Sequence, residues 1–453
     1  METTGEATAT CAVAALPGLA ARLLHEDTTP GSPQSAESFD AYLAAAGYQD
    51  GPAGEAGAGQ LLDAFEQSGL RGRGGAAFPF AVKARTVRRV ARWTVPPVVV
   101  ANGEEGEPAS VKDRWLLRNR PHLVLDGLRL AAAVVGAERA YVYVSDPAAA
   151  RSVAAAVHDA ELAGRLPIPV EITVVEPAYV AGEETAAVRA INGGPAKPAD
   201  KPPRPFEAGV AGRPTLVSNV ETLANLPFVY RHGAAAYRQA GTAASPGTFL
   251  ATITGGGRPP ALYELPHGLP FRELLSLHGV DEGTVHGVLM GGYFSGLIGG
   301  STAVDMTLDH EAVRAAGSGL GCGAVAILGE NDCPVAVAAS VMAYFARENA
   351  GQCGSCFNGT AAMSAVLDAL RDGGATGDDL ARLRRWSMVL RGRGACGTLD
   401  GAVNLAGSLL SHFPETVGRH LEGGRHLAGG CDRCAVSVFR ATRPYEAEEV
   451  SLA

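Results

Sequence analysis

The stretch PPVVVANGEEGEP, residues 96–108, joins an apolar strand to an acidic loop that contains glycine. Its valines predict a buried β-strand, and the loop gathers Glu104, Glu105 and Glu107. Like charges repel, so this grouping at a strand end is unfavourable unless a ligand uses it. Ligands of α/β sheets bind at the carboxyl ends of the strands, which favours a binding site. The alternative is a solvated acidic loop.

The segments around this stretch alternate between helical and strand patterns, from about residue 60 to 241. Residues 123–135 predict a helix, 138–146 a strand, 148–164 a helix and 170–177 a strand. This alternation predicts an α/β sheet covered by helices.

The remaining segments show other sequence patterns. Residues 247–279 hold short β segments, Gly/Pro turns and one short helix, which predicts a small α+β domain. Further on, helices are predicted at about 360–371, 377–390 and 402–421. The predicted division is a variable extension at 1–55, an α/β domain at 56–242, the α+β domain at 243–321, a helical bundle at 322–422 and a tail at 423–453.

Composition narrows the classes of function. The 453 residues are 47% hydrophobic and carry a net charge of −9, which argues against a nucleic-acid-binding protein. Apolar stretches such as residues 130–137 are far shorter than the ~18 residues that a membrane span needs, so no direct membrane insertion is predicted. The start lacks the basic region of a secretory signal, and a cytoplasmic location is expected.

A glycine-rich loop precedes the acidic one. In RGRGGAAFP, residues 71–79, the glycines remove Cβ atoms, so backbone N–H groups can approach a phosphate, and Lys83 adds a positive charge. By itself this segment is equally well an ordinary turn.

Two further motifs follow the predicted sheet strands. In YVAGEETA, residues 179–186, Gly182 permits the close approach of a flat ligand, and two glutamates stand in the first helical turn. Helix capping alone would explain one of these acids. Residues 212–225 form a polar strip with Asn219 and Thr222 inside an apolar frame.

The order and spacing of these four motifs resemble the flavin-carrying, NADH-oxidising subunit of respiratory complex I and the related diaphorase subunits of NAD-linked hydrogenases and formate dehydrogenases. The resemblance extends from about residue 56 to 422. It implies a Rossmann-like α/β flavin domain, a small α+β domain of the β-grasp type and a C-terminal helical bundle with iron–sulfur cysteines.

The resemblance also implies roles for individual residues. FMN or its phosphate would contact Gly72, Gly74, Lys83, Asn102, Glu104, Gly182, Glu183 and Asn219. Glu107 and Glu184 would face the nicotinamide nucleotide as catalytic residues, with Phe78 stacked on a ring and Lys201 near the dinucleotide. The implied chemistry is hydride transfer from NADH or NADPH to FMN, which does the redox work while the protein orients it.

Departures from the family pattern fall first in the nucleotide site. The glycine loop ends Ala77-Phe-Pro-Phe80-Ala81, and Thr86 and Arg204 stand where two aromatic residues are expected. Lost stacking surface predicts weaker dinucleotide binding. Arg204 would instead meet a phosphate, which favours NADPH or another donor.

The second departure concerns the cysteines. Cys353, Cys356 and Cys396 match three of the four ligands that the family gives a [4Fe–4S] cluster, and Ala350 replaces the first. Either Cys431-Asp-Arg-Cys434 supplies the fourth ligand, or the cluster is labile, contains three irons or has been lost. The two tail cysteines could instead form a separate zinc or thiol site. Three other cysteines are expected to be buried small hydrophobes: Cys11, Cys322 and Cys333.

These features predict an FMN-dependent oxidoreductase subunit of the NADH dehydrogenase (diaphorase) type. Electrons would pass from NAD(P)H through the flavin to an iron–sulfur cluster or to a ferredoxin-like partner subunit. The alternative is a non-catalytic scaffold subunit that binds flavin or nucleotide and has lost the cluster.

Overall fold

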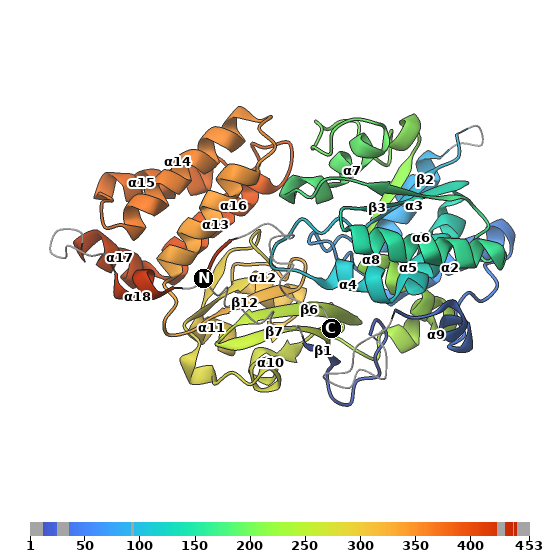
Figure 1. The fold of residues 1–453 in the computed structure, drawn as a ribbon, viewed down its shortest axis with the longest axis horizontal. Helices are drawn as coiled ribbons and strands as arrows, with labels where there is room; N and C mark the ends of the chain where they lie inside the picture. Colours follow the sequence, from blue (N-terminus) through green and yellow to red (C-terminus); the bar gives the residue numbers. More distant parts are fainter. Residues whose placement is uncertain (1–11, 25–35, 92–94, 424–430, 438, 442–453) are drawn as a thin grey trace, which may run out of the picture.

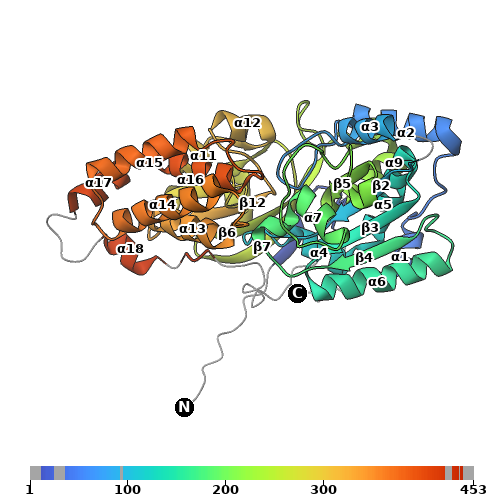
Figure 2. The same cartoon turned by 90° about the horizontal axis from the view of Figure 1, so that it is seen from above.

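The computed structural model describes residues 12–24, 36–91, 95–423, 431–437 and 439–441. Within these ranges the chain forms an α/β structure with a four-stranded parallel sheet, a six-stranded mixed sheet and a two-stranded sheet. Figures 1 and 2 show the parallel sheet with its helices at one end of the molecule and a group of helices at the other. Cys11 lies outside the described residues.

The parallel sheet contains the apolar strand that leads into the acidic loop. Its strand order is β4 (Val170–Val174), β3 (Arg139–Val144), β2 (Val98–Asn102), β5 (Thr215–Asn219). Val99 and Ala101 pack into the large core formed with the helices on one face, whereas Val98 and Val100 pack against α7 (Glu184–Ile191) on the other. Burial on both faces explains why β2 is a continuous apolar run without polar alternation.

Helices cover the first face of the parallel sheet. Those that pack on its strands are α3 (Phe80–Val90), α5 (Pro121–Val135), α6 (Pro147–Leu162) and α8 (Val220–Ala224). Four others pack mainly on these helices: α1 (Phe39–Ala44), α2 (Gly54–Ser68), α4 (Lys112–Asn119) and α9 (Leu226–Tyr237). The predicted helix at 123–135 is thus α5, which begins two residues earlier because Pro121 suits the first turn of a helix.

The six-stranded sheet has the order β1 (Ala12–Ala15), β7 (Arg258–Pro266), β6 (Thr248–Gly255), β12 (Ala324–Leu328), β9 (Gly287–Met290), β10 (Leu297–Gly299). Shorter elements complete this part: β8 (Leu269–Pro270), β11 (Thr307–Leu308), α10 (Phe271–His278), α11 (Gly300–Val304) and α12 (His310–Ala315). β12 pairs with both β6 and β9, so the sheet continues past residue 321.

Strand β1 lies within the segment that shows no period in the sequence. It pairs in parallel with β7. The buried carboxylate of Glu264 accepts hydrogen bonds from the backbone N–H groups of Leu23 (2.9 Å) and Leu24 (3.0 Å), which fastens the chain that follows β1. Tertiary contacts, and not a local pattern, therefore order this part of the chain.

The helical end consists of α13 (Pro334–Glu348), α14 (Gly354–Arg371), α15 (Gly377–Val389), α16 (Thr398–His412), α17 (Pro414–Gly423) and α18 (Asp432–Val436). The helix predicted at 402–421 is in fact two helices. The break falls at Phe413, since Pro414 has no N–H to continue the hydrogen-bond ladder of α16.

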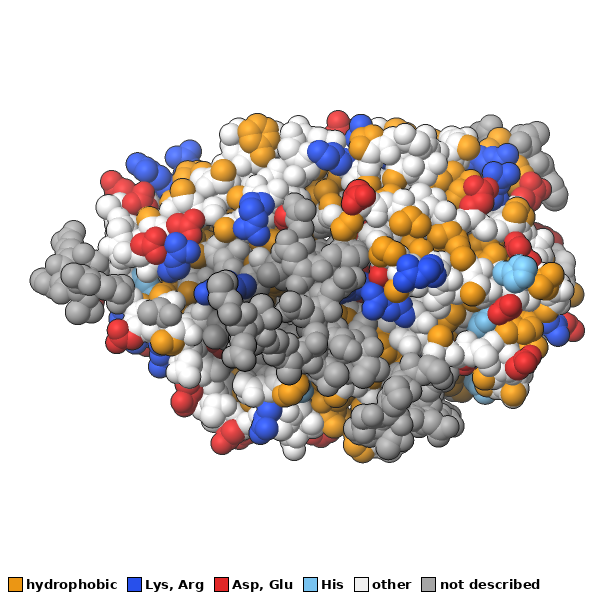
Figure 3. Space-filling model, in the orientation of Figure 1, with side chains coloured by type: hydrophobic (Ala, Val, Ile, Leu, Met, Phe, Trp, Pro, Cys, Tyr) orange, Lys and Arg blue, Asp and Glu red, His pale blue; other side chains and the backbone are white. Residues whose placement is uncertain are grey.

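Two surface properties bear on function. Among the described residues, no helix has the length and apolar character that crossing a membrane requires. On the face shown in Figure 3, basic and acidic side chains are interspersed over the described surface, with neither sign dominating.

Candidate functional site

A cavity of about 660 Å³ lies at the carboxyl ends of the parallel strands. Its lining includes eleven of the twelve residues predicted to bind FMN or nucleotide, namely Gly72, Gly74, Phe78, Lys83, Asn102, Glu104, Glu107, Gly182, Glu183, Glu184 and Asn219. The twelfth, Lys201, stands behind this wall and forms an ion pair with Glu183 at 2.5 Å. All four sequence motifs therefore converge on one space.

Strand register brings the two asparagines together. Asn102 ends β2 and is paired with Asn219, which ends β5. Asn102 Nδ2 donates to the carbonyl of Gly182 (2.8 Å), while Asn219 caps α8 and its Nδ2 donates to Asp113 (2.7 Å). The carboxyl end of the sheet thus positions side chains from distant segments at one edge.

Glycine is required where the loops approach one another. A Cβ at Gly182 would lie 2.8 Å from Oε2 of Glu104, and a Cβ at Gly74 would lie 3.1 Å from Cβ of Asn219. The glycine-rich loop is closed by a hydrogen bond from the N–H of Gly72 to the carbonyl of Phe78 (2.8 Å). Small residues here leave room for a flat ligand beside the backbone.

The acidic loop is buried, so the alternative of a solvated loop is wrong. Glu104 and Glu105 are each 5% exposed. Glu105 has a structural role: it accepts a hydrogen bond from Ser110 (2.6 Å) and faces Arg114 (3.4 Å). Glu107 accepts a hydrogen bond from the N–H of Ala109 (3.2 Å). It also accepts one from the N–H of Tyr293 (3.0 Å), which lies between strands β9 and β10 of the six-stranded sheet.

Burial changes the protonation of two of these acids. It raises the pKa of Glu104 to about 8 and the pKa of Glu107 to about 8. Oε2 of Glu104 is buried beside Gly182 and has no hydrogen-bond partner among the described residues. A neutral carboxyl group with an unused oxygen in the cavity wall suits a polar ligand atom.

Basic side chains surround Glu184 at the start of α7. Lys83 Nζ lies 2.9 Å from Oε2 of Glu184. Burial acts to raise the pKa of Glu184, but Lys83, Lys201 and Arg204 outweigh it and lower that pKa. Glu183 caps α7 by accepting the N–H groups of Thr185 and Ala186, so capping does explain one of the two acids in this motif.

Several contributors to the cavity carry no signal in the sequence. They lie outside the four motifs: Asp113 in the first turn of α4, and Phe206, Gly291, Phe294, Gly321, Cys322 and Gly397 in loops. Behind Asp113 lies a buried ion cluster, in which Lys112 Nζ is 2.7 Å from Asp113 and 2.9 Å from Glu221. Burial lowers the pKa of Lys112, but the surrounding carboxylates raise it overall, which keeps the ammonium charged.

The three predicted cluster cysteines lie together on the bundle side of this cavity. Cys353 caps α14, and its sulfur accepts the N–H of Ala395 (3.4 Å). Burial, with Cys396 and Cys353 adding to it, raises the pKa of Cys356 to about 12. Three thiols fit an iron–sulfur site whose fourth position, Ala350, offers no side-chain ligand.

Cys431 and Cys434 cannot supply the fourth ligand. Both sulfurs lie within 4.8 Å of that of Cys333, the N-cap of α13, whereas Cys353 and Cys356 follow the C-terminal end of the same helix. Fifteen helical residues separate these ends by about 22 Å at 1.5 Å per residue. Figure 1 shows α17 and α18 at the far end of the bundle.

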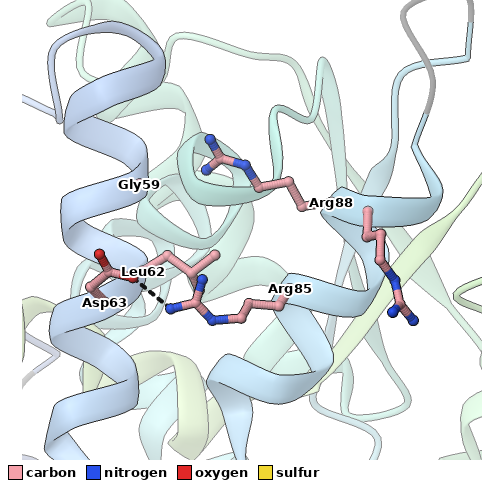
Figure 4. A pocket seen from close by; sticks show the side chains of 6 residues that line it. Gly59, Leu62, Asp63, Arg85 and Arg88 are labelled. Carbon is pink, nitrogen blue, oxygen red and sulfur yellow. Dashed lines mark hydrogen bonds and ion pairs between the residues drawn. The ribbon is translucent and has the colours of Figure 1, made fainter.

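A second hollow, of about 470 Å³, lies between α2 and α3 and is drawn in Figure 4. Of its three arginines, Arg85 is already paired: it lies 2.5 Å from Asp63 and 2.6 Å from Glu66. None of the predicted site residues lines it. The chemistry therefore belongs to the larger cavity.

Comparison with known proteins agrees with this geometry. Residues 65–228 match the Nuo51 FMN-binding domain, and residues 336–420 match the NADH-ubiquinone oxidoreductase-F iron-sulfur binding region. An NADH-quinone oxidoreductase subunit of Rhizobium meliloti is 34% identical over 80% of this chain and 89% of its own. The NADP-reducing hydrogenase subunit HndC of Solidesulfovibrio fructosivorans is 30% identical over 85% and 81%.

A solved structure shows the same arrangement. The chain matches a crystal structure of NAD+-reducing [NiFe]-hydrogenase in the H2-reduced state with a TM-score of 0.74 and 31% identity over 80% of its length. It spans 63% of that hydrogenase chain, just under two thirds. The predicted resemblance, FMN as cofactor and the NADH dehydrogenase-like class are thereby confirmed. This chain belongs to the family of NADH-quinone oxidoreductase subunits that carry the Nuo51 FMN-binding domain and the iron–sulfur binding region.

Proposed function

We propose that the 660 Å³ cavity holds FMN beside a reduced nicotinamide nucleotide, and that electrons leave on its bundle side. The convergence of the four motifs on one cavity carries this proposal. Bound FMN would accept a hydride and release its electrons one at a time. The chain supplies orientation, charge and exclusion of water.

The phosphate of FMN is assigned to the glycine-rich loop. Gly72 and Gly74 have no Cβ, so a phosphate can come close to the loop backbone, although the N–H of Gly72 itself is bonded to Phe78. Lys83 provides a cation that its pair with Glu184 holds in place. Backbone donors with a nearby ammonium form the usual protein environment of a phosphate. Asn102 and Asn219, fixed at the strand ends, then orient the flavin from the sheet side.

The roles of the cavity glutamates follow from whether each is protonated or ionised. With a pKa of about 8, Glu104 stays protonated at pH 7 and can donate a hydrogen bond from its unpartnered oxygen to the cofactor. Glu184 stays ionised beside Lys83 and is assigned, with Glu107 and an exposed Phe78, to the nicotinamide side. Lys201 acts through Glu183 by holding that carboxylate.

The electron exit is assigned to the wall at Gly397. This residue lines the cavity and follows Cys396 directly in the chain. The relatives are named as subunits, and we propose that this chain likewise works in an assembly with an iron–sulfur partner that receives the electrons.

We propose a domain division that follows the same logic. A Rossmann-like α/β domain would occupy 56–242, a β-grasp-type domain 243–321 and a helical bundle 322–422. The parallel sheet, the mixed sheet with α10 and the helices from α13 onward support three parts, but β12 belongs to the mixed sheet, which moves the second boundary from 321 to about 328. The parallel sheet has its own core, and the mixed sheet has a second one beneath α10.

The nicotinamide electron donor is assigned from Arg204, which replaces an aromatic residue of the family pattern. Arg204 lines the cavity in place of an aromatic residue, and one relative is named an NADP-reducing hydrogenase subunit. A guanidinium favours the extra phosphate of NADPH. Arg204→Ala should lower kcat/KM for NADPH about tenfold relative to NADH; an unchanged ratio rejects this assignment.

Anaerobic stopped-flow mixing tests the main proposal. Bleaching of the flavin band by NADH or NADPH is expected, and His158→Ala, on the exposed face of α6, should bleach at the same rate. A flavin that binds but stays oxidised with both donors would favour the scaffold alternative. A colourless preparation that refuses added FMN would reject the cavity assignment.

A further inference from the structure

We infer that Cys333, His420, Cys431 and Cys434 form a mononuclear zinc site at the far end of the helical bundle. One ligand atom from each residue lies within 4.8 Å of all the others. Cys333 and His420 are buried, and the other two are half-buried. The proposal concerns a part of the chain remote from the FMN cavity and stands apart from the proposed function.

The spacing of these atoms matches tetrahedral zinc. Zn–S bonds of about 2.3 Å and Zn–N bonds of about 2.0–2.1 Å place a sulfur and a nitrogen about 3.6 Å apart across a tetrahedral edge. Nε2 of His420 lies 3.6 Å from the sulfur of Cys333 and 3.3 Å from that of Cys434. One ion fits between these atoms with small adjustments.

The histidine is already oriented for coordination. Nδ1 of His420 lies 2.9 Å from the carbonyl of Thr416, and that carbonyl can only accept, so Nδ1 carries the proton. Nε2 then presents its lone pair to the sulfurs. Metal-binding histidines are commonly fixed in this manner by a backbone carbonyl behind the ring.

Local structure places the three thiols. Cys333 stands at the N-cap of α13, where Pro334 begins the helix. Cys431 is the N-cap of α18, and the N–H of Cys434 donates to its carbonyl at 2.8 Å, which forms a tight turn between the two sulfurs. Closely spaced cysteines with a distant pair of ligands are typical of structural zinc sites.

Other occupants fit less well. A four-iron cluster would lie between its ligands and hold them farther apart than these atoms stand. Calcium and magnesium prefer oxygen ligands, whereas thiolates with one imidazole in a tetrahedron select zinc. A plain hydrophobic core would not bring three sulfurs and an imidazole lone pair to one point.

The site would fasten the C-terminal segment to the bundle. Beyond α18, Phe439 packs on Tyr293 with ring centroids 6.2 Å apart, and the N–H of Ala441 donates to Ser340 (2.9 Å). The backbone N–H of Tyr293 donates in turn to Glu107 in the FMN cavity. The ion would thus hold in place a segment that supports one wall of that cavity.

Metal analysis of the purified full chain tests the proposal. About one zinc per chain is expected, and Cys434→Ser and His420→Ala should each lower it at least tenfold. Cys353→Ser is the matched thiol control: it should lower iron and leave zinc unchanged. Zinc below one tenth per chain after growth with zinc, or zinc that survives both ligand substitutions, would overturn the assignment.

X-ray absorption at the zinc edge makes the test independent of how the variants fold. The wild-type chain should show three sulfurs at about 2.3 Å and one nitrogen at about 2.0–2.1 Å. A shell of oxygen and nitrogen alone, or iron that disappears with Cys434→Ser, would contradict a zinc site.

Discussion

Lys83 and Glu184, 101 positions apart in the chain, form an ion pair of 2.9 Å that joins α3, the helix after the glycine-rich loop, to the first turn of α7. Both side chains line the FMN cavity. The pair therefore holds a cation where the phosphate of FMN is expected while it keeps the Glu184 carboxylate charged.

Lys83→Met should weaken FMN binding about tenfold to a hundredfold, the loss expected for one charge-assisted hydrogen bond. Flavin fluorescence titration of the apoprotein measures this. Arg85→Met, in the same helix but paired with Asp63 and Glu66 on the outer face, is the control and should bind FMN normally. Equal losses in both variants would show that helix α3, and not the cation, matters.

Glu104→Gln should change how stability depends on pH. Between the ordinary pKa of 4.5 and its folded pKa of about 8, Glu104 keeps a proton that the unfolded chain has lost. The free energy of unfolding therefore falls as the pH rises through this window, by up to about 1.4 kcal/mol per pH unit, and levels off above it. Glutamine cannot ionise and removes the contribution of Glu104 to this slope, while that of Glu107, whose pKa is also about 8, remains.

Urea denaturation of the apoprotein from pH 5 to 9 measures the effect. Glu161→Gln, exposed on α6, is the control and should keep the wild-type slope. Parallel curves for wild type and Glu104→Gln would show that the carboxyl group is ionised throughout.

Gly182→Ala should impair the cavity. The new methyl group would lie 2.8 Å from Oε2 of Glu104 and 3.1 Å from its carbonyl oxygen, so the acidic loop must move. Overpacking of this kind costs about 1–3 kcal/mol, and FMN affinity should fall at least tenfold. Gly59→Ala meets nothing within 4 Å in the interior of α2 and should be neutral or stabilising. Normal flavin binding by Gly182→Ala would refute the close approach.

Ala350→Cys should increase bound iron. It restores the fourth thiolate beside Cys353, Cys356 and Cys396, and four thiolates hold a [4Fe–4S] cluster. Iron and sulfide are measured after anaerobic purification, with about four of each per chain expected. Ala350→Ser has nearly the same size but a hard oxygen, and should retain no more iron than wild type. Equal iron in the cysteine and serine variants would exclude this position as a ligand.

The local motifs could be predicted because parallel strands bring their carboxyl ends to one edge. Asn102 and Asn219 are far apart in sequence, yet their register in β2 and β5 makes them neighbours. Glu104 and Gly182 follow strands of the same sheet, so their convergence also follows from the α/β pattern. The sequence could not distinguish the structural role of Glu105 from the unpartnered oxygen of Glu104, because both are glutamates of one loop.

Other features depend on packing that no local pattern records. Tyr293 reaches Glu107 only because the mixed sheet lies against the acidic loop. Strand β1 is too short to show alternation, and it is defined by its partner β7. Cys333 is buried as the sequence predicts, but 87 positions separate it from His420, and only the bundle brings them together.

The cavity wall at Gly397 has a consequence for biosynthesis. The glycine-rich loop emerges from the ribosome more than three hundred residues before this last part of the lining, since the cavity is assembled from segments between Gly72 and Gly397. A nascent chain that has completed only its parallel sheet has no enclosed space for the cofactor. The residues assigned to FMN are complete by Asn219, but the cavity around them closes only when translation is nearly finished.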